Sequence, residues 1–490
     1  MFAPANSTDP GAVAGLSPRE THPLCVELEG TLVPSDLLFE ALIVLIKRNP
    51  LYLLRILIWS FRGWAVLDTQ VAARVELNPA ALPYDPELMD WLVTERETGR
   101  QIWLCAVANE PLAKRVASHL KMFDGVLATH RYGDQAAEDL HLRLVERFGA
   151  RGFDYCGRKR QDVAIWKHSR GAIIVRGGRA LRREASRHSR LLQGPPSQVH
   201  GIATLFRALR PHQWVKNGLV FLPLLAAHRI AELAVVSAAL LGLVAFCLCA
   251  SSVYVLNDLL DLEADRANPR KCRRPFAAGH LSLSIGCLLA PVLLSLAFGI
   301  SSFLPSSFTE TLASYYATTL VYSFALKRLV LIDALALACL YTLRLVAGAT
   351  SVGVPLSFWM LLFSVFFFLS LAFVKRFAEL DALKRRNQLQ AMGRGYQVGD
   401  LPIVQSLGIA AGYLSVLVLA LYIDSPAIDS LYRRPKVIWA LCVILLFWVS
   451  RVWMTAQRGA MHDDPVIFAL KDQVSLVVGA LVIVTVLCAI

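Results

Sequence analysis

The sequence predicts two structural classes joined in one chain: an N-terminal α/β domain with a doubly wound sheet, and a C-terminal all-α bundle of nine transmembrane helices. Three observations predict this. Short apolar runs alternate with helix-length segments over residues 24–175, long apolar segments follow from about residue 212, and an arginine-rich stretch broken by the GPPS at 194–197 lies between them. The composition fits a membrane protein, because 56% of the 490 residues are hydrophobic and only 18% are charged, against about 25% in soluble domains.

The charge balance and the cysteines narrow the class of protein further. A formal net charge of +13 favours anionic lipid or anionic substrates as partners. No nucleic-acid partner is expected, because no binding motif of the usual kinds is present. The ten cysteines form no CxxC pair and no Cys/His metal spacing, which is typical of small hydrophobic residues in a reducing compartment. Residues 1–22 lack the pattern of a signal peptide and are expected to be a disordered lead-in.

The N-terminal domain is predicted from five apolar runs of strand length with helical segments between them. This spacing predicts a Rossmann-like, doubly wound sheet. The domain is expected over residues 23–178, a basic linker over 179–206 and the transmembrane domain over 207–490. The runs are LCVEL (24–28), IWLCAV (102–107), GVLAT (125–129), FDYCG (153–157) and AIIV (172–175).

The transmembrane domain is predicted from nine apolar segments. The first is shorter than the roughly 20 residues that a helical span needs. Basic residues cluster in alternate loops, so the N-terminal domain and the active site are expected at the cytoplasmic face of the bacterial inner membrane, with the C-terminus outside. The RRPK at 433–436 breaks this alternation. The segments are 214–229, 232–258, 282–304, 309–325, 331–351, 355–377, 403–423, 437–456 and 472–490.

The second apolar segment ends in a cluster of acids that is followed at once by bases, in VYVLNDLLDLEADRANPRKCRRP at 253–275. At 3.6 residues per turn the acids and one amide share a helix face. One interpretation is a solvated helix end. The favoured one is a magnesium site, because Mg²⁺ takes one or two carboxylates and completes its shell with water and substrate phosphate. The residues of this face are Asn257, Asp258, Asp261 and Asp265, and the bases that follow include Lys271 and Arg274.

Two further polar groups lie in or beside predicted spans. In YSFALKRLVLIDALALACLYTLRLVAGA at 322–349, Ser323 and Lys327 are expected on one helix face, while Asp333 and Arg344 fall within hydrocarbon. Intramembrane charges indicate a functional site, with mutual pairing of Asp333 and Arg344 as the alternative. The third group, VKRFAEL at 374–380, contains Lys375 and Arg376.

These motifs carry a resemblance that covers about residues 207–490. The pattern Asn257-Asp258-x-x-Asp261-x-x-x-Asp265, followed by Lys271, resembles the first aspartate-rich motif of the UbiA superfamily of intramembrane prenyltransferases. The resemblance implies nine helices around a central cavity and Mg²⁺ acting on a diphosphate. The second DxxxD motif of most members is missing here. Instead, RALRPHQWVKN at 207–217 and the residues from Tyr322 to Asp333 are similar to the polyprenyl-phosphate phosphoribosyltransferase branch.

That branch implies a soluble donor, 5-phosphoribosyl-1-diphosphate (PRPP), and a decaprenyl-type polyprenyl phosphate acceptor. By this resemblance Asn257, Asp258 and Asp261 would hold Mg²⁺, and the catalytic residues would be Asp258, Asp261 and Lys327. The substrate-binding residues would be Lys216, Asn217, Asp265, Lys271, Arg274, Tyr322, Ser323, Asp333, Arg344, Lys375 and Arg376.

Two alternatives to this function stay open. One is an aromatic prenyltransferase of the 4-hydroxybenzoate type with a polyprenyl diphosphate donor, against which the missing second DxxxD motif argues. The other is a non-enzymatic polyprenyl-phosphate carrier or scaffold, which has little need of a magnesium site. The lipid length, the donor sugar phosphate, the downstream pathway (a cell-envelope pathway is the natural guess) and assembly into a homo-oligomer also stay open.

The N-terminal domain resembles the haloacid dehalogenase (HAD) phosphatase superfamily in PLCVELEGTLVPSDLL at 23–38. The two aspartates of the family's DxDGT motif are replaced by Glu27 and Glu29, and a glutamate reaches about 1 Å further, a misplacement that can cost about 100-fold in rate. These changes together predict a catalytically dead phosphatase fold, with a weak phosphatase as the alternative. Asp162 is kept, while the other family positions hold Ala106, Leu140 and Arg158.

Residues 37–67 stand where such phosphatases carry a helical cap and are unusually apolar. Pro50 and the interspersed charges argue against a spanning helix. Two interpretations stay open: the core of a cap, or a pair of interfacial helices on the cytoplasmic leaflet with their bases toward anionic headgroups. The bases are Lys47, Arg48, Arg55 and Arg62.

Overall fold

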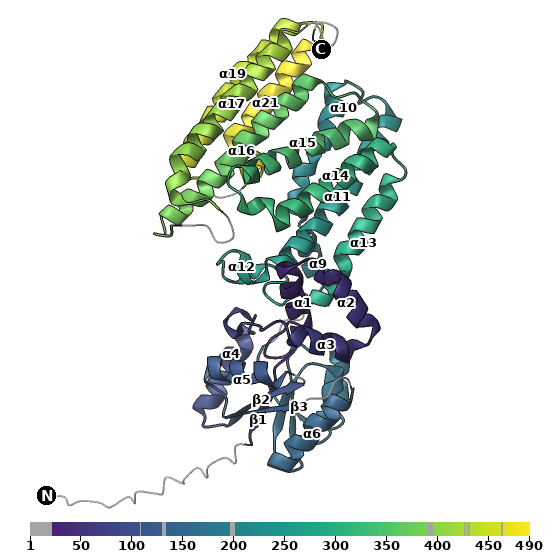
Figure 1. The fold of residues 1–490 in the computed structure, drawn as a ribbon, viewed down its shortest axis with the longest axis vertical. Coiled ribbons are helices and arrows are strands. Elements are labelled where there is room, and N and C mark those ends of the chain that lie inside the picture. Colours follow the sequence, from purple (N-terminus) through teal and green to yellow (C-terminus); the bar gives the residue numbers. More distant parts are fainter. Residues whose placement is uncertain are drawn as a thin grey trace, which may run out of the picture. The chain divides into compact units, whose positions relative to one another are not determined.

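The computed structural model describes residues 22–107, 109–129, 134–196, 201–389, 395–425, 428, 432–461 and 464–490. The lead-in expected at residues 1–22 lies outside the described residues, except for His22. The chain divides into two compact units (Figure 1). One comprises residues 1–201 with 277–283, and the other comprises residues 202–276 with 284–490.

The N-terminal unit contains a parallel sheet with helices, as the sequence predicts. Its strand order is β3-β2-β1-β4-β5-β6, with all neighbouring strands parallel. The chain starts in the middle of the sheet at β1 and adds β2 and β3 on one side. It then returns to the other side of β1, where it adds β4, β5 and β6. The strands are β1 (Leu24–Glu27), β2 (Ile102–Val107), β3 (Gly125–Thr129), β4 (Asp154–Gly157), β5 (Gly171–Ile174) and β6 (Arg190–Leu191).

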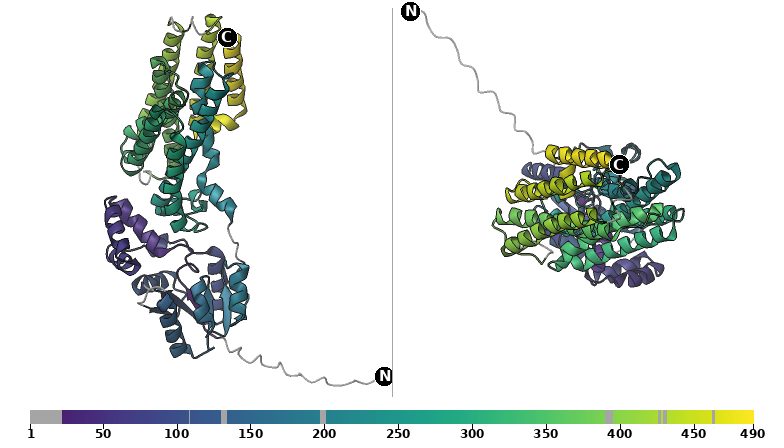
Figure 2. Two further views of the ribbon diagram at one scale, coloured as in Figure 1. Left: turned by 90° about the vertical axis from the view of Figure 1, so that its right-hand side faces the viewer. Right: turned by 90° about the horizontal axis from the view of Figure 1, so that it is seen from above.

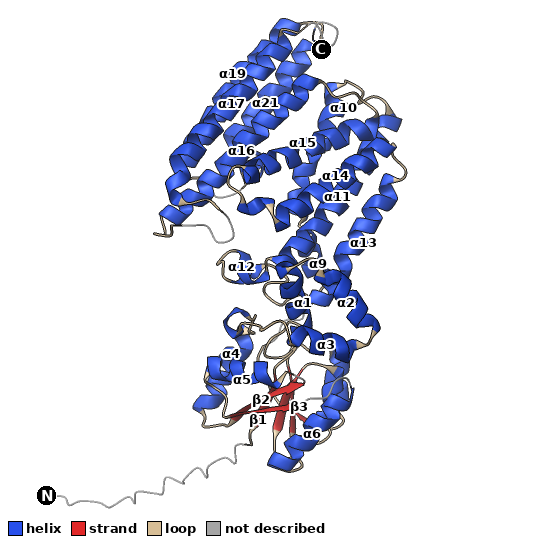
Figure 3. Cartoon of the chain, in the orientation of Figure 1, coloured by secondary structure: helices blue, strands red, loops and turns tan. Residues whose placement is uncertain are grey.

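Helices cover both faces of this sheet, as Figure 3 shows. Leu24 and Val26 pack on one face against α1, α3, α4 and α5, while Cys25 packs on the other against α6, α7 and α8. Both faces are buried because successive side chains of a strand point to opposite sides. The helices are α1 (Leu37–Arg48), α2 (Tyr52–Phe61), α3 (Trp64–Ala72), α4 (Pro86–Glu97), α5 (Glu110–Leu120), α6 (Asp134–Phe148), α7 (Val163–Trp166) and α8 (Arg179–Ser186), with 3-10 turns η1 (Pro79–Ala81) and η2 (Arg160–Asp162).

The second unit is helical throughout its described part. Helix α15 (Ile332–Val352) contributes to two apolar clusters, one with α11, α13 and α14 and the other with α16, α17, α19 and α21. Figure 2 shows the helices of this unit from two further sides. The other helices are α9 (Ile202–Leu209), α10 (Leu222–Ala226), α11 (Leu233–Leu260), α12 (Leu262–Arg266), α13 (Leu283–Ser301), α14 (Ser306–Phe324), α16 (Phe358–Lys384), α17 (Leu401–Ile423), α19 (Ala440–Gln457), α20 (Pro465–Lys471) and α21 (Gln473–Ala489). Short 3-10 segments are η3 (Pro211–Phe221), η4 (Lys271–Arg273), η5 (Leu326–Arg328), η6 (Val398–Asp400) and η7 (Pro435–Trp439).

Fewer candidate spans are found among the described residues than the nine that the sequence predicts. Within the described residues six helices are long and apolar enough to cross a membrane, or seven if α20 and α21, which are bent by 84°, form one span. The count of nine is therefore not confirmed. The first expected span, 214–229, is instead the 3-10 segment η3 followed by the five-residue helix α10. Helix α14 has 19 residues but is not among the six.

A close backbone approach holds η3 against α15. A Cβ atom added at Gly348 of α15 would lie 2.1 Å from the carbonyl oxygen of Val220. We expect Gly348→Ala to lower the free energy of unfolding by about 1–3 kcal/mol, as overpacking does in other cores. Gly299→Ala on α13 is the matched control, because a Cβ there meets nothing within 4 Å. Thermal unfolding in detergent measures both, and equal midpoints for the two variants would contradict the expected clash.

Candidate active site

The acid cluster lies where α11 ends and the chain turns into α12. Helix α11 stops at Leu260 and Asp261 joins it to α12, so the acids do not share one continuous helix as predicted. Asp258 and Asp265 nevertheless converge on one cation. Arg274 Nη1 donates to Asp258 Oδ1 at 3.1 Å and to Asp265 Oδ2 at 2.5 Å. Both carboxylates are buried, with side chains 2% exposed.

A second arginine reaches Asp258 from the start of η3. Arg210 donates a hydrogen bond to Asp258 Oδ1, and its guanidinium lies over the ring of Tyr254 at 5.6 Å. The sequence analysis did not name Arg210, although it lies within the 207–217 segment that carried part of the resemblance. The other oxygen, Asp258 Oδ2, is buried and finds no hydrogen-bond partner among the described residues.

Asp261 pairs with Lys327, which joins two elements far apart in the sequence. Lys327 Nζ lies 3.0 Å from Asp261 Oδ1 and 3.4 Å from Oδ2. The expectation that Ser323 and Lys327 share a helix face is wrong. Helix α14 ends at Phe324, Lys327 lies in η5, and Ser323 Oγ donates inside its own helix to the Thr319 carbonyl at 2.8 Å.

The donor chemistry of this cluster fits a magnesium ion that shares its ligands with a substrate. Asn257 is half-buried beside Asp258, and Lys271 is exposed in η4. Over the described residues no group of three or more His, Cys, Asp or Glu side chains could hold a metal by itself. Mg²⁺ needs only one or two carboxylates when water and phosphate complete its shell. The open oxygen of Asp258 and the carboxylate of Asp261 meet that requirement.

Arg344 lies in an aromatic and amide enclosure within the membrane domain. Its Nε donates to Asn217 Oδ1 at 3.0 Å and its Nη2 to the Tyr315 hydroxyl at 3.2 Å. The guanidinium also lies over the rings of Phe246, Tyr315 and Tyr341, at 5.6, 5.2 and 5.1 Å. Mutual pairing of Arg344 with Asp333, the alternative raised from the sequence, is therefore wrong.

Asp333 pairs with Arg376 instead. Arg376 Nε and Nη2 both donate to this carboxylate, the second at 3.1 Å, and the two side chains are 1% and 0% exposed. The Tyr322 hydroxyl donates to Asp333 Oδ1 at 2.9 Å, and Arg376 Nη1 donates to Glu379 Oε2 at 2.6 Å. Three of the predicted substrate-binding residues thus satisfy one another, joining α14, α15 and α16.

In a third cluster, two of the residues predicted to bind substrate, Lys216 and Lys375, lie around Asp464, an acid that was not predicted from the sequence. Asp464 Oδ2 lies 2.8 Å from Lys216 Nζ and 3.1 Å from Lys375 Nζ, and Asp464 Oδ1 lies 3.3 Å from the Tyr341 hydroxyl. Burial raises the pKa of Asp464, but the ammonium groups of Lys375 and Lys216 outweigh it and hold that pKa below its usual range. The acid therefore stays ionised between two cations.

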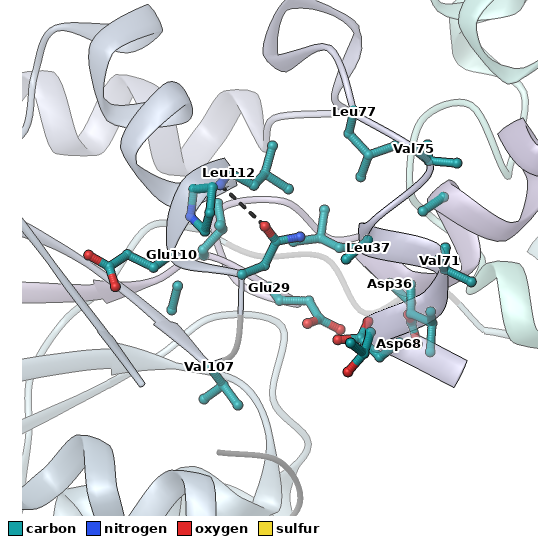
Figure 4. A pocket seen from close by; sticks show the side chains of 18 of the residues that line it. Glu29, Asp36, Leu37, Asp68, Val71, Val75, Leu77, Val107, Glu110 and Leu112 are labelled. Carbon is teal, nitrogen blue, oxygen red and sulfur yellow. Dashed lines mark hydrogen bonds between the residues drawn. The ribbon is translucent and has the colours of Figure 1, made fainter. Parts of the chain in front are cut away.

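The N-terminal unit has its own pocket of about 870 Å³, beyond the ends of β1 and β2. Figure 4 shows Glu29, Asp36 and Asp68 gathered on one side of the pocket and Val75 and Leu77 on another. Five carboxylates and two cations line the pocket: Glu29, Asp36, Asp68, Glu76 and Glu110, with Arg115 and Lys159. Lys159 Nζ lies 3.4 Å from Glu29 Oε1.

The other positions that carried the HAD resemblance are packed or engaged in hydrogen bonds. Ala106 lines the pocket, and Leu140 of α6 is fully buried in the core. Glu27 is buried and accepts a hydrogen bond from the Tyr155 hydroxyl. Asp162 accepts from the backbone N–H groups of Arg158 and Lys159 at 2.8 and 2.7 Å.

Glu27 gives the N-terminal unit a pH-dependent stability. Burial, and then the charge of Asp162, raise the pKa of Glu27 from 4.5 to about 8 against the opposing effects of Lys159 and Tyr155; Glu29 is a smaller raising influence. Between these two values the folded state keeps a proton that the unfolded state loses. The free energy of unfolding therefore falls as pH rises from about 4.5 to about 8, by up to about 1.4 kcal/mol per pH unit from this group.

Glu27→Gln is expected to remove that contribution while keeping the shape of the side chain. Pulse proteolysis of the N-terminal unit in the detergent-solubilised full chain, at pH 5.5 and pH 7.5, measures the change. The variant is expected to lose less stability between the two pH values than the parent chain. Asp162, whose pKa burial raises to about 6, also titrates in this range, so both proteins are expected to lose some stability between the two pH values. An unchanged pH difference would contradict a protonated Glu27.

Fold and site together define the class: this is an integral membrane protein whose helical domain carries buried acids paired with lysines and arginines. The chain belongs to the UbiA prenyltransferase family, whose model matches residues 219–470. It is therefore a transferase of the prenyltransferase type, for which the family suggests a prenyl phosphate lipid as substrate.

Three relatives extend this result. An uncharacterized protein, y4nM, of Sinorhizobium fredii is 35% identical over 94% of this chain and 89% of its own length. Nodulation protein NoeC of Azorhizobium caulinodans is 37% identical over 56% of this chain and 89% of its own length. Decaprenyl-phosphate phosphoribosyltransferase of Mycolicibacterium smegmatis is 31% identical over 57% of this chain and 90% of its own length.

Proposed function

We propose that the chain transfers 5-phosphoribosyl from PRPP to a decaprenyl-type polyprenyl phosphate, with Mg²⁺, at the cytoplasmic face of the bacterial inner membrane. Diphosphate is the leaving group. The observation that carries the proposal is the pairing of Asp258 and Asp261 with Arg210, Arg274 and Lys327 at the end of α11. The similarity to a decaprenyl-phosphate phosphoribosyltransferase supports it.

On a diphosphate donor, the acids of this site would bind the metal ion and the bases would bind the phosphate oxygens. Mg²⁺, when bound by Asn257, Asp258 and Asp261, would supply positive charge that neutralises the leaving diphosphate. Arg274 and Lys327 already hold these acids, so their remaining N–H groups are placed to grip phosphate oxygens. Their pairing also keeps the two carboxylates in place before the substrate arrives.

The transfer itself breaks the bond from ribose C1 to the diphosphate oxygen and forms a bond from C1 to an oxygen of the lipid phosphate. The lipid phosphate is already an anion near pH 7, so the reaction needs no strong general base. Catalysis is then mainly positioning and charge stabilisation by these side chains. Direct displacement predicts inversion at C1.

A second anion site is proposed at Lys216 and Lys375. Two ammonium groups share the single carboxylate of Asp464, which leaves one positive charge in excess. A lipid phosphate or the 5-phosphate of the donor fits that excess. Arg344, held between Asn217 and three aromatic rings, adds a further positive charge inside the membrane domain. Asp333 and Arg376 form a buried ion pair with each other, and we propose that this pair positions α15 against α16.

For the N-terminal unit we propose a HAD-like fold over residues 23–178 that has lost phosphatase activity. A carboxyl with a pKa of about 8, such as that of Glu27, is mostly neutral at pH 7 and is a poor nucleophile. The excess of carboxylates in the pocket also disfavours a phosphate ester there. Residues 207–490 are proposed as the transferase domain; of the linker expected at 179–206, α8 and β6 belong to the N-terminal unit instead.

A radiolabel transfer assay on the purified chain in detergent tests the transferase proposal. The assay contains labelled PRPP, polyprenyl phosphate and Mg²⁺. Label that moves into the lipid phase and is lost with EDTA is the expected result. A reaction of polyprenyl diphosphate with 4-hydroxybenzoate in place of this transfer would overturn the proposal in favour of an aromatic prenyltransferase. Inactivity with both donor sets would favour a polyprenyl-phosphate carrier.

A further inference from the structure

Helix α2 exposes five of its eight large apolar and aromatic side chains. Trp59 is its only buried residue. Leu53, the least exposed of the large apolar residues in this surface, is 50% exposed, and Phe61, the most exposed, is 90% exposed. We call this surface the α2 face; it comprises Leu51, Leu53, Leu54, Leu57, Ile58, Phe61 and Trp64. Contiguous apolar surface of this kind on a soluble domain marks an interaction site.

The helices on either side of α2 bury apolar side chains in the core of the domain. Helix α1 buries Leu37, Ala41, Leu42 and Leu45, and α3 buries Leu67 and Val71. The interpretation of residues 37–67 as the core of a cap therefore holds for α1. It does not hold for most of α2: Trp59 belongs to the same core and Tyr52 and Ile56 pack partly buried against it, but the side chains of the α2 face stay exposed.

The charges around the α2 face are all positive. No acidic residue occurs between Glu40 and Asp68. Arg48, Arg55 and Arg62 are exposed within this interval, and the guanidinium of Arg55 lies over the ring of Tyr52 at 5.4 Å. A helix that combines bases with exposed Leu, Phe and Trp is typical of one that lies in the interface of an anionic membrane.

The length of α2 and the attachment of its domain select the same partner. Ten residues of helix span about 15 Å, which is half of the roughly 30 Å hydrocarbon core, so α2 cannot cross the bilayer. The domain that carries it is covalently joined to an integral membrane domain through the chain between β6, which ends at Leu191, and α9, which begins at Ile202. That tether keeps the α2 face at a high effective concentration beside lipid, so even weak insertion is populated.

We propose that the α2 face inserts into the headgroup region of an anionic phospholipid leaflet, with Arg48, Arg55 and Arg62 at the level of the phosphates. The inserted face would hold the N-terminal unit against the membrane in which the transferase domain is embedded. This inference is independent of the reaction that the membrane domain catalyses.

Photo-crosslinking in the full chain tests the partner directly. The chain is reconstituted in vesicles of phosphatidylethanolamine and phosphatidylglycerol, with p-benzoylphenylalanine in place of Phe61 or Leu54. Leu142, a 61% exposed residue of α6 in the same unit, is the negative control position, and Leu288, 67% exposed on the membrane helix α13, is the positive one. Mass spectrometry identifies what each position captures.

Phospholipid adducts at positions 54, 61 and 288, but not at 142, are the expected result. Replacing phosphatidylglycerol by phosphatidylcholine, or introducing Arg55→Glu with Arg62→Glu, is expected to lower the yield at position 61 severalfold while leaving position 288 unchanged. Capture of residues 202–490 of the same chain would assign the face to the membrane domain, and a crosslinked dimer would assign it to a second copy. Either result, or no adduct at 54 and 61 when 288 reacts, would overturn the proposal.

Discussion

Asp258→Asn is expected to reduce phosphoribosyl transfer by about 10²–10³-fold, a loss of roughly 3–4 kcal/mol of transition-state stabilisation. Asparagine keeps the size and one oxygen of the side chain but removes the charge that faces Arg210 and Arg274. The unpartnered oxygen, Oδ2, is the atom we assign to the metal. The loss is expected in the maximal rate at saturating PRPP, measured with the radiolabel assay over a series of Mg²⁺ concentrations.

Glu263→Gln provides the matched control for this variant. Glu263 lies on α12 between the same acids but is exposed, so the substitution is expected to leave the rate unchanged. Thermal unfolding of both variants separates lost chemistry from lost structure, because Asp258 also holds two arginines. A folded Asp258→Asn protein with the rate of the parent chain would remove this residue from the catalytic site.

The acid motif and the general architecture could be predicted from sequence because both are local patterns. Strand-length apolar runs give the parallel sheet, and the spacing of Asp258, Asp261 and Asp265 identifies the end of α11. The count of spans could not be predicted in the same way. Residues 214–229 are apolar enough to suggest a span, but the segment folds as a 3-10 stretch and a short helix packed against Gly348.

The partners of the predicted site residues could not be read from the sequence, because they depend on how helices pack. Asp464 lies 89 positions from Lys375 in the chain and outside every motif, yet it pairs with that lysine. The apolar segment 331–351 places both Asp333 and Arg344 in hydrocarbon, but it does not show that the carboxylate of Asp333 pairs with Arg376. Arg210 could have been named as a site residue from the sequence, because it is a charged residue directly before Pro211 in the segment 207–217 that carried part of the resemblance.

Arg376→Met is expected to lower the free energy of unfolding by about 3–5 kcal/mol, because it removes the arginine that pairs with the buried carboxylate of Asp333. The hydroxyl of Tyr322 still donates to Asp333 in the variant, but a neutral hydroxyl does not balance the negative charge of the carboxylate. Denaturant unfolding in mixed micelles measures the change. The matched control is Arg385→Met at the C-cap of the same helix, because the exposed pair of Arg385 with Asp381 at 2.9 Å is expected to contribute at most about 1 kcal/mol.

The double variant Arg376→Met with Asp333→Leu separates a structural from a substrate-binding function. Replacing both partners by apolar residues removes the buried charge, so most of the lost stability is expected to return. If this stable double variant keeps its transfer rate within a fewfold, the pair positions α15 against α16 and does not contact substrate. A stable but inactive double variant would instead return Asp333 and Arg376 to the substrate-binding residues. An Arg376→Met protein as stable as the Arg385→Met control would contradict the assigned energy, because the carboxylate would then have found another partner.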